Sequence, residues 1–454
     1  REIQLFVLRQ PTLTQTLIPA CWVTYWASGY APSLAHRGSS TLGLKRPHFS
    51  TKAPPMVRAD FPYFSHHPKD VYLDSAATTH KPSVVIEAVR ACYENYAPIH
   101  RGLYRSSVEL SDQYEQVRSV AAAFIGAVPE EIIFTKNATE GLNLLAHSLP
   151  LAGSWNEGDE VILSVADHHA VILPWQEAAK RHGLALRFLE LDEQGAIDLE
   201  SLPTILSDRT RAIAITHVSN TLGSITALPR LRQILTMQGS EAVVIADACQ
   251  SAPHFPISVG SLGADFLVFS GHKLYAPAGT GVLWGRESML SSLPPLLTGG
   301  DMVVQVGRLE SAFLPPPQRF EAGTPATEGV IGLGAALRYL TRIGMDAVRQ
   351  HTHDLALAFC DQLRPVPGLS ILASPHPDSG IISFSMQGVH AHDVAQFLGD
   401  RSICVRAGQQ CAALAHGAMG VPASVRVSLG IYSMPEDIAP LVTGLTDLYH
   451  LFHG

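Results

Sequence analysis

Short apolar segments alternate with amphipathic ones along most of the chain, and this alternation restricts the possible folds most strongly. Seven strand-like segments rich in Val, Ile, Leu and Phe lie at residues 130–135, 159–165, 185–191, 211–219, 241–248, 264–271 and 281–286. Helix-like stretches follow several of them, such as the one that ends at Gly183. Apolar strands separated by helices are typical of a mostly parallel sheet covered on both faces. We therefore predict an α/β fold with a large, mostly parallel seven-stranded sheet.

The pattern changes after a long apolar helix predicted over residues 329–344. Beyond it, helices are predicted at 346–364, 391–400 and from 435, and strands at 380–386, 403–408 and 424–430. These elements predict a smaller C-terminal α/β domain over residues 329–454. The large domain is then expected over 81–328, preceded by a segment, 57–80, that joins the small domain. Residues 294–320, rich in Pro and Gly, are predicted to form a loop between the two domains.

The first 56 residues differ in composition from the rest of the chain. They hold six Arg or Lys, one acidic residue and 11 Ser or Thr, which is typical of an organellar transit peptide. Three interpretations stay open: a targeting segment, a structured arm, or upstream sequence outside the working protein, since Met56 is a plausible start. The expected location is the cytoplasm, or a plastid or mitochondrion if residues 1–55 are a transit peptide.

Composition excludes several classes of protein. Apolar residues make up 46% of the chain, which is too apolar for a disordered protein. The net charge is −8, so no strong basic field exists, and we expect no nucleic-acid partner. No apolar run reaches the length of a membrane span, so we expect no membrane partner. The six cysteines lie far apart without a CxxC pair, which indicates a reduced compartment, and we assign no metal ligands.

Polar residues at the ends of two predicted strands point to a particular cofactor. Asp247 ends one strand, Gln250 follows it, and Lys273 follows the next strand. Ligands in open α/β sheets bind at the carboxyl ends of the strands, so these side chains can face one pocket. Pyridoxal phosphate needs this pair, because it binds a lysine covalently and an aspartate keeps its ring nitrogen protonated. We therefore predict pyridoxal 5′-phosphate as the cofactor.

The phosphate of such a cofactor needs hydrogen-bond donors, and the sequence offers a group of them. Ala138 and Thr139 begin a predicted helix directly after a strand, where free backbone N–H groups and the helix dipole favour an anion. Ser270 and His272 lie next to Lys273 and can add side-chain donors. We predict that these residues bind the phosphate.

Two further strand ends provide groups for a flat ring. His168 follows the strand at 159–165, where its imidazole could stack on the ring. Asn220 follows the strand at 211–219 and could bond to the ring oxygen or to the substrate.

The sequence at this point resembles a known family. The motifs that carry the resemblance are YLDSAATTHKP, TKNATEGLN, LSVADHHAVILPWQ, VSNTLGSI, DACQSAPHFP, FSGHKLYAPAGTGVLWGR and RFEAGTPAT. They are similar to class V aminotransferases and, more narrowly, to cysteine desulfurases of the SUF/CSD type (group II), also called selenocysteine lyase-like. The resemblance covers residues 58–454.

The resemblance implies a fold-type I homodimer that binds pyridoxal phosphate near the subunit boundary. Lys273 is then the lysine bound to the cofactor, Asp247 the partner of the ring nitrogen and Gln250 the contact of the ring hydroxyl. His168 stacks on the ring, and Thr324 reaches the phosphate of the partner chain.

The motif VRAGQQCA (405–412) matches the short loop that carries the nucleophile in this family, which makes Cys411 the sulfur acceptor. Arg426 matches the arginine that binds the substrate carboxylate. The family usually has His immediately before the cysteine, whereas this chain has Gln409 and Gln410, so an acid/base role at that position is absent. We expect Gly408 to let the loop bend toward the pocket.

The reaction implied is conversion of L-cysteine to L-alanine, with a persulfide left on Cys411 and with Lys273 moving the α-proton. We expect the sulfur to pass to an acceptor protein of the SufE/CsdE type, for iron–sulfur cluster assembly or other sulfur-transfer biosynthesis. Cys404 is expected in the core, and Cys249 is expected to serve packing.

Three alternatives remain at this point. Another class V transaminase or epimerase would need Lys273 and Asp247 and have no use for Cys411. A selenocysteine lyase would use the same residues. A scaffold that binds sulfur without catalysis would lack the lysine or the cysteine.

Overall fold

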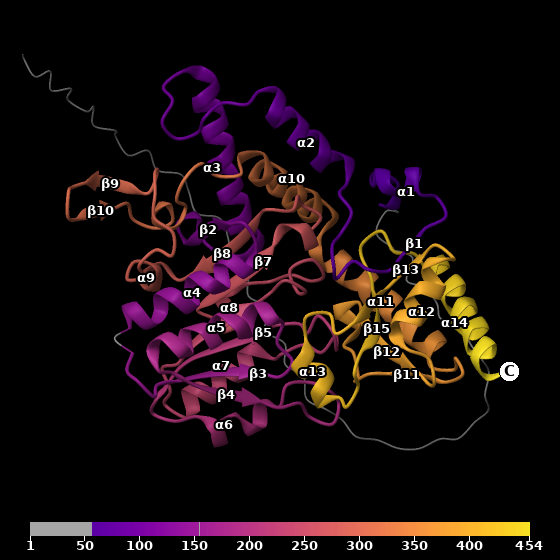
Figure 1. Cartoon of the computed structure of the whole chain (residues 1–454). Coiled ribbons are helices and arrows are strands. Elements are labelled where there is room, and N and C mark those ends of the chain that lie inside the picture. Colours follow the sequence, from indigo (N-terminus) through magenta and orange to yellow (C-terminus); the bar gives the residue numbers. More distant parts are fainter. Residues whose placement is uncertain (1–56, 154) are drawn as a thin grey trace, which may run out of the picture. The chain divides into compact units, whose positions relative to one another are not determined.

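A seven-stranded sheet forms the centre of the larger part of the fold (Figure 1). The computed structural model describes residues 57–153 and 155–454. The strands of this sheet are β2 (Ile132–Thr135), β3 (Glu160–Ser164), β4 (Ala185–Leu189), β5 (Thr210–Thr216), β6 (Val243–Asp247), β7 (Phe266–Ser270) and β8 (Gly281–Gly285). Their order is β2-β8-β7-β6-β5-β3-β4, and only β8 pairs antiparallel to its neighbours. The predicted mostly parallel sheet is confirmed.

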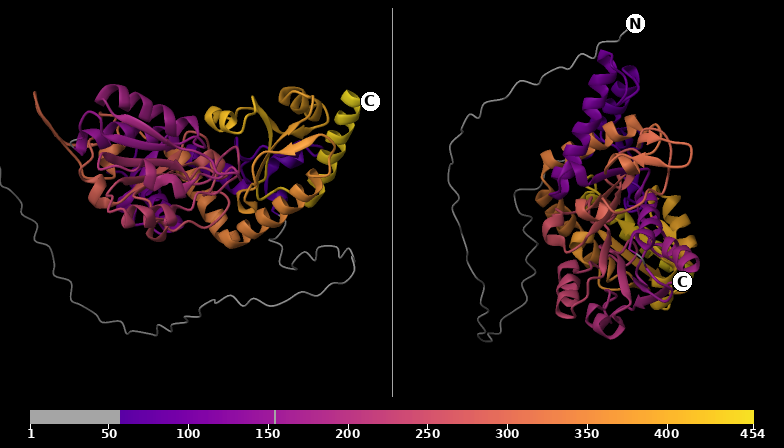
Figure 2. Two further views of the ribbon diagram at one scale, coloured as in Figure 1. Left: turned by 90° about the horizontal axis from the view of Figure 1, so that it is seen from below. Right: turned by 90° about the vertical axis from the view of Figure 1, so that its left-hand side faces the viewer.

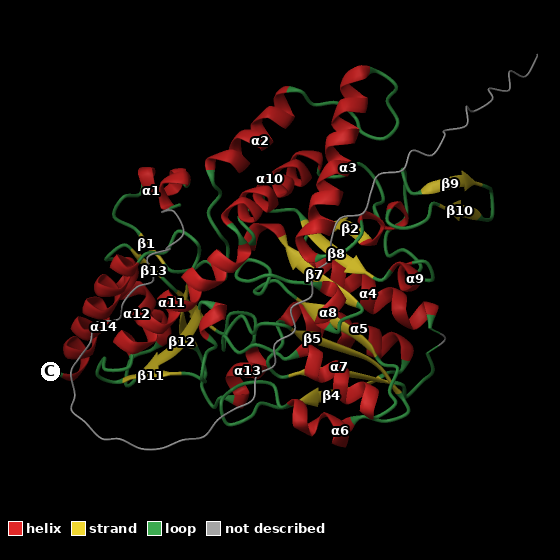
Figure 3. Ribbon diagram, turned by 180° about the vertical axis from the view of Figure 1, so that it is seen from behind, coloured by secondary structure: helices red, strands yellow, loops and turns green. Residues whose placement is uncertain are grey.

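Helices cover both faces of this sheet (Figure 3). The helices are α3 (Arg105–Ile125), α4 (Ala138–Ala152), α5 (His169–His182), α7 (Leu228–Met237) and α10 (Thr327–Ile343). Neighbouring residues of a strand point to opposite faces, so on β5 Ile213 packs in the core with α3, α7 and α10, whereas Ala214 packs in the core with α4 and α5. Burial on both faces explains why the strands β6, β7 and β8 are almost wholly apolar.

Two of these helices begin where strands of the sheet end, and their first turns are capped by side chains. Asn137 follows β2 and accepts a hydrogen bond from the Glu140 N–H at 2.9 Å before α4. His168 follows β3 and accepts from the Ala170 N–H through Nδ1 at 3.0 Å before α5. The starts of α4 and α5 are thereby fixed at the carboxyl edge of the sheet.

The C-terminal part contains a second, four-stranded antiparallel sheet with the order β11-β12-β15-β14. Its elements are β11 (Leu369–Ile371), β12 (Ile381–Met386), β14 (Arg406–Gly408), β15 (Ser424–Ser428), α11 (Met345–Leu363), α12 (Ala391–Gly399), α13 (Ala413–Ala418) and α14 (Ile438–His453). Phe359, Phe384 and Leu445 belong to its separate apolar core. Figure 2 shows these elements, orange to yellow, beside the seven-stranded sheet.

The N-terminal described segment joins the C-terminal part by strand pairing. Strand β1 (Val71–Tyr72) pairs parallel to β13 (Ile403–Cys404), and helix α1 (Pro62–His66) precedes it. Helix α2 (Ser83–Glu94) packs against α10, and the short helices are α6 (Leu202–Ile205), α8 (Val259–Leu262) and α9 (Glu287–Leu290). The described residues belong to one compact unit, so the domain limits 57–80, 81–328 and 329–454 stay predictions.

The structure corrects the sequence analysis in three places. The predicted loop 294–320 contains a hairpin, β9 (Val303–Val306) and β10 (Ser311–Phe313), because a β-branched run precedes a glycine turn. The strand predicted at 403–408 is divided, since β13 pairs with β1 and β14 with β15. Helices α2 and α3 were missed.

The interpretations of residues 1–56 lie outside the described residues. Within residues 57–153 and 155–454, none of the helices combines the length and the apolar character that a membrane crossing requires.

Candidate active site

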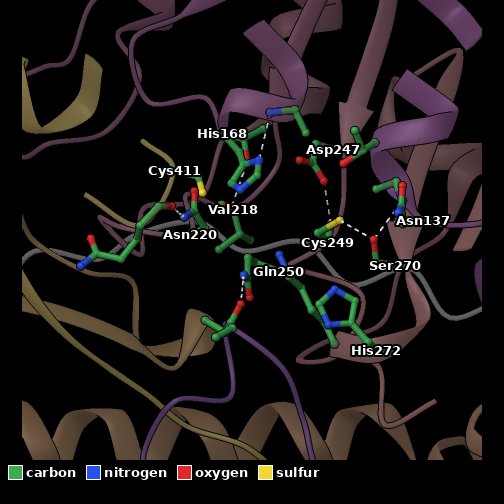
Figure 4. Close-up of a pocket in the computed structure, with 18 of the residues that line it drawn as sticks. Asn137, His168, Val218, Asn220, Asp247, Cys249, Gln250, Ser270, His272 and Cys411 are labelled. Carbon is green, nitrogen blue, oxygen red and sulfur yellow. Dashed lines mark hydrogen bonds between the residues drawn. The ribbon is translucent and has the colours of Figure 1, made fainter. Parts of the chain in front are cut away.

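A cavity of about 380 Å³ lies at the carboxyl ends of β3, β5, β6 and β7 (Figure 4). It brings together nearly all the residues predicted for the site: Ala138, Thr139, His168, Asn220, Asp247, Gln250, Ser270, His272, Lys273, Cys411 and Arg426. Figure 4 shows Cys411 at one end with His168 and Asn220, and Ser270, Asn137 and His272 at the other. The volume is within the range of small-molecule and cofactor pockets.

Thr324 lies elsewhere in the chain, in a second cavity lined also by Lys136 and Glu321. The expectation that it acts on a partner chain stays a prediction.

The acid and the base of the predicted cofactor site lie on neighbouring strands. Asp247 is buried at the end of β6, and its Oδ1 accepts the N–H of Cys249 at 3.0 Å. Lys273 lies in the turn after β7 and lines the same cavity. Gln250 donates from Nε2 to the carbonyl of Ala76 at 2.9 Å. This places a carboxylate, an amine and an amide around one space.

His168 is a neutral imidazole at the wall of the cavity. Burial first, and then the positive charge of Lys273, lowers the pKa of His168 to about 4. His272, which also lines the cavity, has its pKa lowered to about 4 by burial and by the charges of Lys273 and Lys81. Two uncharged rings therefore border the Lys273 amine at neutral pH.

The start of α4 forms the far end of the cavity. The Ala138 N–H donates to the Ser270 hydroxyl at 2.9 Å, which joins the helix start to the end of β7. Cys249 is buried beside them, and burial followed by the charge of Asp247 raises the pKa of its thiol to about 12. Cys249 is thus a protonated, enclosed thiol, in line with the packing role expected for it.

Cys411 is exposed and lines the cavity at its other end. Its backbone carbonyl accepts the N–H of His169 at 2.8 Å, and the carbonyl of Gln410 accepts from Asn220 Nδ2 at 2.7 Å. The loop reaches the cavity with Gly408 at a φ of 109°, and its expected bending at Gly408 stays a prediction. Cys404, by contrast, is half-buried on β13, and burial raises the pKa of its thiol.

Arg426 is buried on β15 and faces the same cavity. Its Nη1 donates to the carbonyl of Asn220 at 2.9 Å, and its Nη2 lies 3.3 Å from Oδ1 of Asp74. Burial lowers the pKa of Arg426, and the nearby Asp74 and Cys411 oppose this effect. An arginine stays charged under these conditions, so the cavity holds a fixed cation.

Sequence reasoning missed one arginine that lines the cavity and two acidic residues that contact its lining. Asp74 binds Arg406 at 2.7 Å as well as Arg426, and Arg406 lines the cavity. Asp167 accepts the N–H groups of Ser164 and Thr216, both at 2.7 Å, where β3 and β5 separate. Asp74 and Asp167 lie inside two of the motifs that carry the family resemblance. Their place in those motifs was the sequence feature from which they could have been predicted.

The cavity contains buried polar atoms that fit a bound polar molecule. Asn220 Oδ1, Gln250 Oε1 and Arg426 Nε are buried, and none has a hydrogen-bond partner within the described residues. Buried polar atoms without partners cost free energy, so a ligand that bonds to them is favoured. Pyridoxal phosphate with an amino acid offers a ring hydroxyl, a phosphate and a carboxylate. The residues present therefore fit this cofactor.

Known proteins are similar to this chain in both sequence and fold. The family model of class V aminotransferases matches residues 71–441. A cysteine desulfurase of Escherichia coli (strain SE11) is 41% identical over 403 residues, covering 87% of this chain and 98% of the relative.

Two solved structures give the same result. The cysteine desulfurase CsdA from Escherichia coli has a TM-score of 0.81 at 34% identity and covers 88% of this chain and 99% of its own. The apo cysteine desulfurase from Thermococcus onnurineus NA1 has a TM-score of 0.82 at 37% identity, with coverages of 89% and 99%. The predicted resemblance and fold class are confirmed. The chain belongs to the class V aminotransferase family, in which its relatives are cysteine desulfurases.

Proposed function

We propose that this protein is a pyridoxal-phosphate-dependent cysteine desulfurase. It converts L-cysteine to L-alanine and keeps the sulfur as a persulfide on Cys411. The observation that carries the proposal is the single cavity that contains the Lys273–Asp247 pair, the buried Arg426 and the exposed Cys411. A transaminase would have no use for an exposed thiol at this place.

The cofactor is held by residues from both ends of the cavity. Lys273 binds it covalently, Asp247 holds the proton on the ring nitrogen and Gln250 bonds to the ring hydroxyl. His168 stacks on the ring, and Ala138, Thr139, Ser270 and His272 bind the phosphate, with the partner's Thr324. When bound, pyridoxal phosphate stabilises the negative charge left by removal of an amino acid's α-proton.

Arg426 binds the substrate. Its planar guanidinium is fixed by Asn220 and Asp74, and its buried Nε has no hydrogen-bond partner among the described residues. A carboxylate prefers such a donor, which can make two parallel hydrogen bonds. The α-carboxylate of L-cysteine therefore lies at Arg426, with Asn220 beside it.

Lys273 and Cys411 carry out the proton and sulfur transfers. The Nζ of Lys273 takes the α-proton and returns a proton to the carbon fragment. The Cys411 thiolate attacks the substrate sulfur, so that an S–S bond forms while the C–S bond breaks. One sulfur atom moves from substrate to protein, L-alanine leaves, and no external oxidant or reductant is consumed.

The persulfide is passed on to a partner protein. Cys411 is exposed at the mouth of the cavity, so a second protein can reach it. We propose an acceptor of the SufE/CsdE type, which draws off the sulfur for iron–sulfur cluster assembly or other biosynthesis. The proposed setting is the reducing cytoplasm, where a free thiol persists.

The protein acts as a homodimer. Large apolar side chains are exposed on the α2–α3 connection and the β9–β10 hairpin, with Leu103 and Leu309 each 97% exposed. Arg101 of the α2–α3 connection forms an ion pair at 2.6 Å with Asp301, two residues before β9. An exposed apolar surface of this kind favours association with a second copy. Light scattering of the purified protein tests this by its mass.

Alanine formation from L-cysteine tests the function. The wild type should form alanine in the presence of reductant, and Cys411→Ser should stop this, because a hydroxyl is a poor nucleophile toward sulfur. Cys404→Ser is the matched control and should keep the activity. Full alanine formation by Cys411→Ser from L-cysteine would refute the proposed role. Activity on selenocysteine alone would favour a selenocysteine lyase.

A further inference from the structure

The residue before the nucleophile has its side chain fixed by a single neighbour. Gln410 donates from Nε2 to the backbone carbonyl of Ser424 at 3.0 Å, and its Oε1 accepts from the Ser424 hydroxyl at 3.2 Å. Ser424 is fully buried at the start of β15, two positions before Arg426. The amide of Gln410 is therefore attached to the strand that carries the substrate-binding arginine.

This attachment holds a backbone conformation that ordinary residues avoid. Gln410 and Cys411 have φ angles of 43° and 57°, in the left-handed region. Two consecutive non-glycine residues in this region are strained, and they keep it only where the surroundings impose it. The carbonyls of Gln410 and Cys411 are held by Asn220 and His169, at 2.7 and 2.8 Å.

A second set of contacts, made by His416, holds the Ser424 side chain. His416 is buried on α13, and its Nε2 lies 3.0 Å from the Ser424 hydroxyl. The Nδ1 of His416 lies 3.0 Å from the carbonyl of Ala412, the residue after Cys411, and donates to it. The Nε2 of a neutral His416 is then an acceptor, so it shares the one proton of the Ser424 hydroxyl with Gln410 Oε1. The loop is thus attached to Ser424 directly through Gln410 and indirectly through His416.

We propose that Gln410 is a positioning residue, whose amide is clamped by Ser424 and so keeps the Cys411 thiol at the cavity. The inference rests on the proposed role of Cys411 as sulfur acceptor. An amide exchanges no proton in the physiological range, so Gln410 acts on the place of the thiol and not on proton transfer. Gln410, the residue before the nucleophilic cysteine, thus has a structural role in this chain.

The holoenzyme variant Gln410→Leu tests the clamp, since leucine has similar bulk and makes no hydrogen bond. Loss of both side-chain bonds should lower kcat for alanine formation from L-cysteine about tenfold. The KM for cysteine and the pH midpoint of kcat should be unchanged. Alanine formation from L-cysteine sulfinate should also be unchanged, because its leaving group departs without thiol attack.

The control is Gln409→Leu, an exposed neighbour whose Nε2 makes one bond, to the Pro422 carbonyl at 3.2 Å. It should behave as the wild type. Ser424→Ala removes the hydroxyl and keeps the backbone carbonyl, and it should lower kcat for cysteine about threefold. This variant tests the clamp if Gln410→Leu does not fold.

Three results would overturn the clamp: wild-type kcat in Gln410→Leu and Ser424→Ala, equal losses with cysteine and sulfinate, or a shifted pH midpoint. A wild type that forms no alanine from cysteine would instead refute the proposed function, so the two failures are distinguishable.

Discussion

Asp74 and Arg426 are 352 residues apart in the sequence, yet Oδ1 of Asp74 lies 3.3 Å from Nη2 of Arg426. Asp74 also binds Arg406 at 2.7 Å, so one carboxylate lies between two cations at the edge of the cavity. Arg426 lines the cavity, and its buried Nε has no hydrogen-bond partner among the described residues. The charge balance around Arg426 thus suits an anion that enters from the cavity.

Arg426→Lys should weaken the use of L-cysteine while bound cofactor is kept. Lysine offers a point charge and no planar pair of donors, so the loss should be about 2–3 kcal/mol in transition-state stabilisation, roughly 30- to 150-fold in kcat/KM. Steady-state kinetics and the visible spectrum measure the two effects. Arg187→Lys, at the far edge of the sheet, is the control. Wild-type kinetics in Arg426→Lys would show that the carboxylate binds elsewhere.

Borohydride reduction of the purified protein should attach the cofactor permanently to the peptide that contains Lys273. Lys81 is the informative competitor, because it lies 3.2 Å from the carbonyl of His272 and burial lowers its pKa to about 8. Peptide mass analysis distinguishes the two lysines. Lys273→Arg should abolish the label and Lys81→Arg should keep it; label on Lys81 would contradict the cofactor assignment.

The stability of the protein should fall on mild acidification. Burial lowers the pKa of His254 from 6.5 to about 4, so the unfolded chain binds this proton more readily. His254 makes its full contribution to the free energy of unfolding above about pH 6.5. About 3 kcal/mol of this contribution is lost as the pH falls toward 4.

Other groups titrate in the same range, and burial raises the pKa of Asp167 to about 8, which acts in the opposite direction. The comparison of wild type with His254→Gln therefore isolates the histidine. Guanidinium unfolding at pH 7.5 and pH 5 should show a smaller acid-induced loss in the variant. An equal loss would show that the pKa of His254 is not lowered in the folded protein.

A buried ion pair should make a large contribution to stability near Thr324. Arg118 and Glu321 are buried and joined by two contacts, at 2.7 and 3.0 Å. Glu321→Gln should lower the free energy of unfolding by about 3 kcal/mol. This is the lower end of the range for breaking a buried ion pair, because Glu115 still binds Arg118.

The control is Glu177→Gln, since Glu177 and Lys180 form an exposed pair that should contribute less than about 1 kcal/mol. Chemical unfolding of both variants measures the difference. Equal effects of the two substitutions would contradict the account of the buried pair.

The sequence predicted the sheet and the residues at its strand ends, because alternation and strand ends are local properties. Asp247, Lys273 and His168 could be named for that reason. The Asp74–Arg426 contact depends on chain segments far apart in sequence, which only the folded chain brings together. The left-handed backbone at Gln410 and Cys411 has no sequence signal either, since neither residue is glycine. Helices α2 and α3 were missed because neither follows a predicted strand, so no strand–helix alternation marks them.

The most direct test of the central claim is peptide mass analysis of the wild-type holoenzyme after brief exposure to L-cysteine without reductant. The account predicts one added sulfur atom on the peptide that contains Cys411, with L-alanine formed in equal amount. Cys249 and Cys404, whose thiols have raised pKa values through burial, should stay unmodified. Alanine formed with no sulfur on Cys411, or with the sulfur on Cys404 or Cys249, would contradict the account.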